Sequence, residues 1–128
     1  MGFLKKFFAT AEIKETKVLP WINLTEVEQI NLISERSKSK IQIIFKYSSR
    51  CSINRIMFNR FVDSYELSES SADLYYLDII NYRELSSLIA NKFQILHESP
   101  QVLIVRNGVV VAHESHGAIS KMNINTYI

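Results

Sequence analysis

The sequence predicts a single α/β domain with a mixed central sheet and flanking helices, over residues 1–128. Short apolar runs typical of strands alternate with segments whose apolar residues recur every three or four positions, as in amphipathic helices. Strands that are connected through helices pair in parallel, because each helix crosses over one face of the sheet. An Asn-Gly pair between two apolar runs near the C-terminus adds one antiparallel hairpin.

The composition agrees with one globular domain. Of 128 residues, 47% are hydrophobic, and only three are Gly and two are Pro. A chain of this size buries roughly 68% of its unfolded surface, which is enough for one core. The net charge of +2 is small and the charged residues are scattered, so we expect no nucleic-acid partner. We also expect no membrane span, because no apolar run reaches the roughly 18 residues that a span needs.

The cysteine content and the start of the chain bear on the compartment. One cysteine cannot form an internal disulfide, so we expect a reducing compartment, the cytoplasm. The start, MGFLKKFF, places two lysines inside an apolar stretch, whereas a signal peptide carries its charges first. We therefore expect residues 1–19 to be an N-terminal arm of the domain.

The first strand candidate is the short apolar run at residues 21–24. Thr25 and Glu28 have the spacing of a capping box, which predicts that a helix starts at Thr25. The next strand candidate, residues 40–47, is rich in Ile and aromatic residues and contains no Gly or Pro. Its apolar residues on one face are Ile41, Ile43 and Phe45.

The middle of the chain continues this alternation. From Ile53 the apolar period changes to three and four residues, which predicts an amphipathic helix. Residues 74–80 form a nearly continuous apolar run, which suits a strand covered on both faces. A third helical stripe then runs over residues 82–93.

The C-terminal part predicts the hairpin and one more helix. Strands at 101–106 and 109–115 flank Asn107-Gly108, a strong signal for a two-residue hairpin turn. Ser120 is placed to cap a last short helix that ends near Tyr127. Three strand–helix units followed by a hairpin and a helix have the order of elements of a thioredoxin-like fold.

Cys51 stands where the second predicted strand gives way to a helix. A helix start presents unpaired N–H groups and about half a positive charge, which favour a thiolate over a thiol. Arg50 adds a positive charge and Ser52 a hydroxyl donor, and no carboxylate occurs between residues 40 and 62. The alternative, an inert buried cysteine, is disfavoured by the polar run SSRCS around it.

A proline stands directly before the hairpin, in the sequence Ser99-Pro100-Gln101. Thioredoxin-like proteins have a cis proline at this position, against the active cysteine, so we expect a cis Ser99–Pro100 bond. A trans proline at the start of a strand is the alternative. With a cis bond, Ser99 can offer its backbone to an extended peptide or a small thiol.

Three positions after Cys51 the chain has Asn54 rather than a second cysteine. In a Cys-x-x-Cys motif the second cysteine resolves a mixed disulfide, so a dithiol cycle within this chain is excluded. A monothiol cycle remains, in which Cys51 takes a small thiol from a mixed disulfide and passes it to a second small thiol. Asn54 either hydrogen-bonds the sulfur or only occupies the first helical turn.

Several stretches carry a resemblance to a known family. They are WINL (21–24), FKYSSRCSIN (45–54), YYLDIINYRELSSLIANKF (75–93) and HESPQVLIVRNGVVVAHESHGAIS (97–120). In these stretches the chain resembles the monothiol bacilliredoxin-like proteins of the bacillithiol system, which are thioredoxin-like proteins of the bacterial cytoplasm. The resemblance implies that Cys51 is the nucleophile, that Pro100 is the cis proline and that bacillithiol is the small thiol. The family commonly has Ser at position 54, where this chain has Asn.

We therefore expect a monothiol thiol–disulfide oxidoreductase that removes or transfers a low-molecular-weight thiol on protein mixed disulfides. Cys51 is the expected catalytic residue. The residues expected to bind the substrate or the small thiol are Arg50, Ser52, Asn54, Ser99 and Pro100. We expect no bound cofactor and no metal, with bacillithiol as the implied co-substrate.

Two other functions stay open. One is a non-catalytic thioredoxin-like module that binds partners and carries a regulatory or vestigial cysteine. The other is iron–sulfur cluster carriage, as in some monothiol glutaredoxins, but Ser52 and Ile53 depart from the Cys-Gly-Phe-Ser motif of those proteins. The three histidines match no zinc-ligand spacing; they are His97, His113 and His116.

Overall fold

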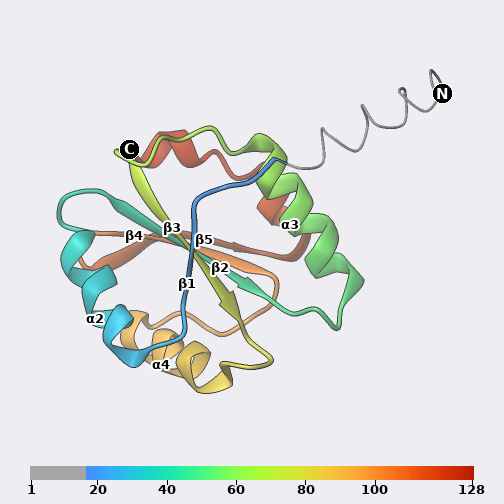
Figure 1. Ribbon diagram of the computed structural model, residues 1–128, viewed down its shortest axis with the longest axis horizontal. Helices are drawn as coiled ribbons and strands as arrows, with labels where there is room; N and C mark the ends of the chain where they lie inside the picture. The colour runs from blue at the N-terminus through green and yellow to red at the C-terminus, as the bar shows by residue number, and fades with distance from the viewer. Residues whose placement is uncertain (1–16) are drawn as a thin grey trace.

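Figure 1 shows a computed structural model of the chain, which describes residues 17–128. The expected N-terminal arm, residues 1–19, lies outside the described residues except for its end. The elements are β1 Trp21–Asn23, α2 Val27–Arg36, β2 Ile41–Tyr47, α3 Ser52–Ser64, β3 Ala72–Asp78, α4 Arg83–Phe93, β4 Gln101–Arg106, β5 Val109–Ser115, η1 His116–Lys121 and η2 Ile124–Tyr127. Within the described part of the chain, no helix is long and apolar enough to cross a membrane.

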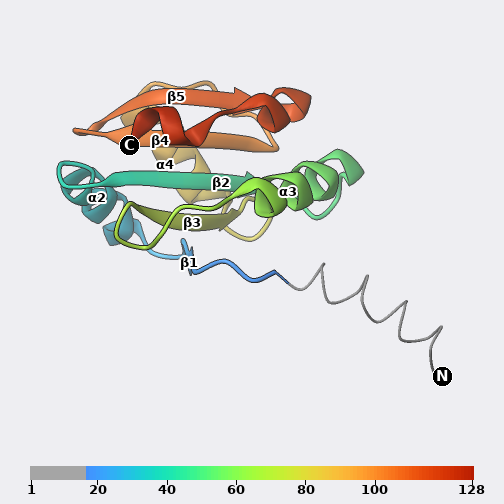
Figure 2. The same ribbon diagram turned by 90° about the horizontal axis from the view of Figure 1, so that it is seen from above.

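The strands form one five-stranded mixed sheet in the order β1-β3-β2-β4-β5 (Figure 2). β1 and β2 both pair in parallel with β3, while β4 pairs antiparallel with β2 and with β5. The parallel pairs follow from the helical crossovers, so the predicted α/β class with a mixed sheet is confirmed. Because β2 and β3 run in the same direction, their carboxyl ends lie at the same edge of the sheet. The loops that lead into α3 and α4 begin there.

The hairpin between β4 and β5 turns at the predicted Asn-Gly pair. Asn107 and Gly108 both have positive φ, at 54° and 81°, which Asn and Gly adopt more readily than other residues. Ser37, after the end of α2, holds this turn: its carbonyl accepts the Asn107 N–H and its hydroxyl accepts the Gly108 N–H, each at 2.8 Å.

The core has two halves, one on each face of the sheet. α3 and η1 cover the face with Ile41, Ile43 and Phe45, as β2 periodicity predicted. α2 and α4 cover the other face, which Ile44 joins. Figure 1 shows α2 and α4 together on one side and α3 with the C-terminal segment on the other. β3 contributes to both halves, so its apolar run reflects burial on two faces.

Two predicted helix ends are wrong in detail. α2 starts at Val27 with Glu26 as its N-cap, and Gln29 Oε1, rather than Glu28, accepts the backbone N–H groups of Thr25 and Glu26. The expected last helix consists of two 3₁₀ turns, η1 and η2, and Ser120 lies inside η1 rather than at its start. The Ser120 hydroxyl instead donates to the Gly117 carbonyl three residues back, at 2.9 Å.

Candidate thiol site

Cys51 is the N-cap residue of α3 and is exposed. Its backbone is extended, with φ −125° and ψ 127°, and its carbonyl accepts the Asn54 N–H at 3.1 Å, which closes the first turn of the helix. Cys51 therefore lies at the junction of strand and helix that the sequence predicted. α3 has 13 residues, which is long enough for its aligned peptide dipoles to place positive potential at this end.

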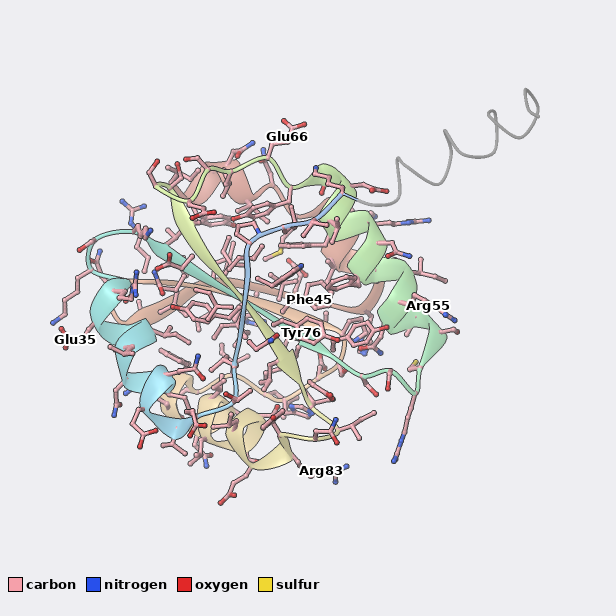
Figure 3. The ribbon with its side chains drawn as sticks, viewed as in Figure 1. Glu35, Phe45, Arg55, Glu66, Tyr76 and Arg83 are labelled. Atoms are coloured by element: carbon pink, nitrogen blue, oxygen red, sulfur yellow. The ribbon has the colours of Figure 1, made fainter. Side chains whose placement is uncertain are left out.

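An aromatic cluster fixes α3 on the sheet. The ring of Phe58 packs against Trp21, Phe45 and Tyr76, with centroid distances of 5.2, 5.3 and 5.7 Å. Figure 3 shows Phe45 and Tyr76 inside the molecule, while Arg55 points outward from α3. Each such pair contributes about 0.5–1.5 kcal/mol beyond its buried area, so the helix that carries Cys51 is held firmly.

The Ser99–Pro100 peptide bond is cis, as predicted. Pro100 is buried, and its carbonyl accepts the His116 N–H at 3.0 Å. β4 begins at Gln101, which pairs across the sheet with Lys46 near the end of β2. The loop that carries Ser99 and Pro100 therefore lies beside the loop that leads to Cys51.

Asn54 connects these two loops. Its side chain is 1% exposed, and its Oδ1 accepts the Ser48 N–H at 2.8 Å and the Ser99 hydroxyl at 2.7 Å. Among residues 17–128, no hydrogen bond joins the Asn54 side chain to the Cys51 sulfur. Of the two roles considered from the sequence, the first-turn position holds, with an added role as a link that the sequence did not reveal.

The other expected binding residues separate in space. Ser52 is exposed at the first position of α3. Arg50 is exposed too, and its N–H donates to the Ser48 hydroxyl at 3.3 Å. Arg50 and Ser48 line a pocket of about 390 Å³, together with Arg83 and Ser86 of α4 and with His97. Ser52 does not line this pocket.

Lys46 lies behind the pocket, and sequence reasoning missed it. It is 0% exposed, and its Nζ lies 3.3 Å from His97 Nδ1, which also meets the Ser86 hydroxyl at 2.8 Å. Burial lowers the pKa of Lys46 to about 8, so this lysine is mostly charged at pH 7. The available signal was its position in β2 on the same face as buried Ile44, where a lysine is unusual.

The pKa of His97 responds to burial and to the charges around the ring. Burial lowers the pKa of His97, and the positive charges of Lys46 and Arg83 lower it further, against a weaker opposite effect of Glu98. Lys46 Nζ and the Ser86 hydroxyl both lie within hydrogen-bonding distance of the same ring nitrogen, His97 Nδ1. No group of three or more His, Cys, Asp or Glu side chains within the described range is arranged to hold a metal ion.

Comparisons with known proteins agree with this architecture. One solved structure is described as a candidate oxidoreductase with a thioredoxin fold and is 31% identical to this chain. The match covers 82% of this chain and 90% of that one, with a TM-score of 0.65. The thioredoxin pre-protein of Schistosoma mansoni is 18% identical, with 84% and 98% covered and a TM-score of 0.62. Thioredoxin O2 of Arabidopsis thaliana is 16% identical, with 79% and 86% covered and a TM-score of 0.60.

The two thioredoxins are too distant in sequence to show more than the fold. They establish that the mixed sheet, the helix after β2 and the segment before β4 form a thioredoxin-like arrangement. The family described as monothiol bacilliredoxin BrxC is more specific, because its profile matches residues 22–124, from β1 to the start of η2. The matched range includes Pro100 and the single-cysteine motif that begins at Cys51. This chain belongs to the monothiol bacilliredoxin BrxC family.

Proposed function

We propose that the protein is a monothiol thiol–disulfide oxidoreductase that takes a low-molecular-weight thiol from protein mixed disulfides through Cys51. The family implies a thiol redox role and bacillithiol as the small thiol. The observation that carries the proposal is the position of Cys51, exposed at the start of a long helix with no second cysteine in the chain. A reducing compartment, the cytoplasm, is where such a thiol would work.

The reaction has two exchanges. The Cys51 thiolate attacks the small-thiol sulfur of the mixed disulfide, so that a new S–S bond forms at Cys51 and the substrate protein leaves as a thiolate. A second small thiolate then attacks the sulfur held on Cys51. This step releases the Cys51 thiolate and the disulfide of two small thiols. The substrate cysteine is reduced, the one free small thiol is oxidised, and the transferred small thiol stays in a disulfide throughout.

Three features support this cycle, and the first of them excludes a dithiol one. Asn54 occupies the place of a resolving cysteine, and its Oδ1 is already used by Ser48 and Ser99. The exposed sulfur leaves room for a bulky mixed disulfide. Ser99, next to cis Pro100, lies on the loop beside Cys51, where an extended substrate segment can pair with its backbone.

The test follows the small thiol. A protein in mixed disulfide with bacillithiol is incubated with wild-type enzyme and free bacillithiol, and the intact mass of the substrate is followed. Wild type should remove the added mass, and trapping without free thiol should leave bacillithiol on Cys51. Cys51→Ser should do neither.

A matched control separates the site from the mere presence of a thiol. The double variant Cys51→Ser/Ser70→Cys moves the thiol to an exposed loop at the start of β3, the opposite end of the sheet from Cys51. It should be as inactive as Cys51→Ser. If Cys51→Ser keeps the wild-type rate, the proposed function fails and a partner-binding module is the better reading.

A further inference from the structure

The pocket beside Cys51 is positively charged and has no acidic lining. We name it the cationic pocket, defined by Ser48, Arg50, Arg83, Ser86, Ser87 and His97 with two isoleucines of the β3–α4 loop. Two arginines and three serines line one space of about 390 Å³. This volume is at the small end of ligand pockets.

The charges around the pocket are not neutralised. Within residues 17–128, no carboxylate lies within 4 Å of the Arg50 or Arg83 guanidinium, and Lys46 adds a buried ammonium behind His97. No acidic residue is among the described residues that line the pocket. Asp78 accepts three hydrogen bonds from Ile80 and Asn81, while Glu84 and Glu98 do not line the pocket.

The position of Arg83 is unfavourable for the helix alone. It is the first residue of α4, at the end where the helix dipole is already positive, and the side chain of its N-cap residue, Tyr82, makes no capping hydrogen bond. Arg50 also lies at the positive end of a helix, just before Cys51, the N-cap residue of α3. Two helix starts and two arginines therefore add positive potential to one pocket, a combination that a bound anion would stabilise. Figure 3 shows Arg83 beside the start of α4, at the outside of the molecule.

We propose that the cationic pocket binds the carboxylate-bearing part of the small thiol while its sulfur is joined to Cys51. This inference rests on the proposed function and adds to it the residues that would recognise the small thiol. Arg50, which lines the pocket, is the neighbour of Cys51 in the chain, so the pocket adjoins the loop that carries the reacting residue. Arg50 and Arg83 pair with carboxylate oxygens, and the serine hydroxyls and the His97 ring serve the remaining polar groups.

The test measures selectivity rather than activity alone. One substrate protein is prepared as mixed disulfides with bacillithiol, with uncharged 2-mercaptoethanol and with coenzyme A, whose anions are phosphates. The quantity is the kcat/KM for the bacillithiol adduct divided by that for the 2-mercaptoethanol adduct. In Arg83→Ala this ratio should fall about tenfold, which corresponds to loss of one hydrogen bond to a charged group. In wild type the ratio should also fall as salt is raised.

Arg60→Ala is the matched control, because Arg60 is an exposed arginine on α3 away from the pocket lining. It should leave the ratio within twofold of wild type. An unchanged ratio in Arg83→Ala overturns the pocket assignment. An Arg83-dependent preference for the coenzyme A adduct over the bacillithiol adduct overturns the proposal that the bound group is a carboxylate. Either result leaves the proposed function standing, because turnover of the 2-mercaptoethanol adduct through Cys51 measures that function separately.

Discussion

The hydroxyl of Ser99 donates a hydrogen bond to Asn54 Oδ1 at 2.7 Å, across 45 positions of sequence. The same oxygen accepts the Ser48 N–H at 2.8 Å. One buried amide thus holds the loop before Cys51, the first turn of α3 and the loop before Pro100 in a fixed arrangement. In a dithiol relative the corresponding residue is a cysteine that reacts, whereas here it is an asparagine that holds the two loops in position.

Asn54→Ala should destabilise the fold by about 1–3 kcal/mol, because it leaves the Ser48 N–H and the Ser99 hydroxyl without their acceptor. Urea unfolding measures this free energy. Asn59→Ala, at an exposed position of the same helix, is the control and should change stability by less than about 0.5 kcal/mol. Similar losses in the two variants would mean that the link carries no stability of its own.

Asn54→Cys tests whether the single-cysteine motif sets the mechanism. The Asn54 N–H lies 3.1 Å from the Cys51 carbonyl, so the new thiol would stand one helical turn after the first. After Cys51 has taken the small thiol, the introduced thiolate should attack Cys51, release the small thiol and close an internal disulfide. Wild type should release no small thiol until free thiol is added. Single-turnover assays without free thiol distinguish the two, and equal behaviour would contradict the prediction.

The protein should become more stable as the pH rises through the range in which buried Lys46 loses its charge. Its pKa is lowered to about 8 by burial from an ordinary value of 10.5, so between these values the unfolded chain binds more protons than the folded one. The free energy of unfolding therefore rises as pH increases through that window, by about 1–3 kcal/mol. Burial raises the pKa of Tyr65, Tyr75 and Tyr76 to about 12, which opposes this rise only above pH 10.

Lys46→Met isolates the contribution of this lysine, since the tyrosines remain in both proteins. At pH 7 the variant should be more stable than wild type, because it removes a buried charge that has no carboxylate partner among the described residues. The difference should shrink between pH 8 and 10. Urea unfolding at pH 7, 8.5 and 10 measures it, and a constant difference would show that Lys46 does not titrate in this range.

The local pattern of the sequence predicted most of the fold. The apolar run at residues 40–47, the helical spacing from Ile53 and the Asn107-Gly108 turn each depend on neighbours in the chain, and the element that each predicted is confirmed. The cis Pro100 followed from its place before the hairpin. The predicted capping box at the start of α2, Thr25 with Glu28, was one residue too early, because the observed box pairs Glu26 with Gln29.

The links within the site could not be predicted in this way, because they join residues that are far apart in the sequence. The contact of Lys46 with His97 spans 51 positions, and that of Asn54 with Ser99 spans 45. No periodicity encodes such pairs, because they arise only when β2, β4 and α4 have packed. The sequence could indicate that Cys51 is placed to react, but the pocket beside it required the loops of three elements to be brought together.

Native Cys51 should react with iodoacetamide faster at neutral pH than Cys51 in the urea-unfolded chain. In the folded chain the sulfur is exposed at the start of α3, where the helix dipole and Arg50 place positive potential beside it. Arg50→Ala should slow native alkylation about two- to fivefold at low salt, with a smaller effect at high salt, because an exposed charge acts weakly and is screened. Arg60→Ala should leave the native rate unchanged. If the native cysteine instead reacts more slowly than the unfolded one, the folded environment protects the sulfur, and Cys51 is better explained as part of a partner-binding surface.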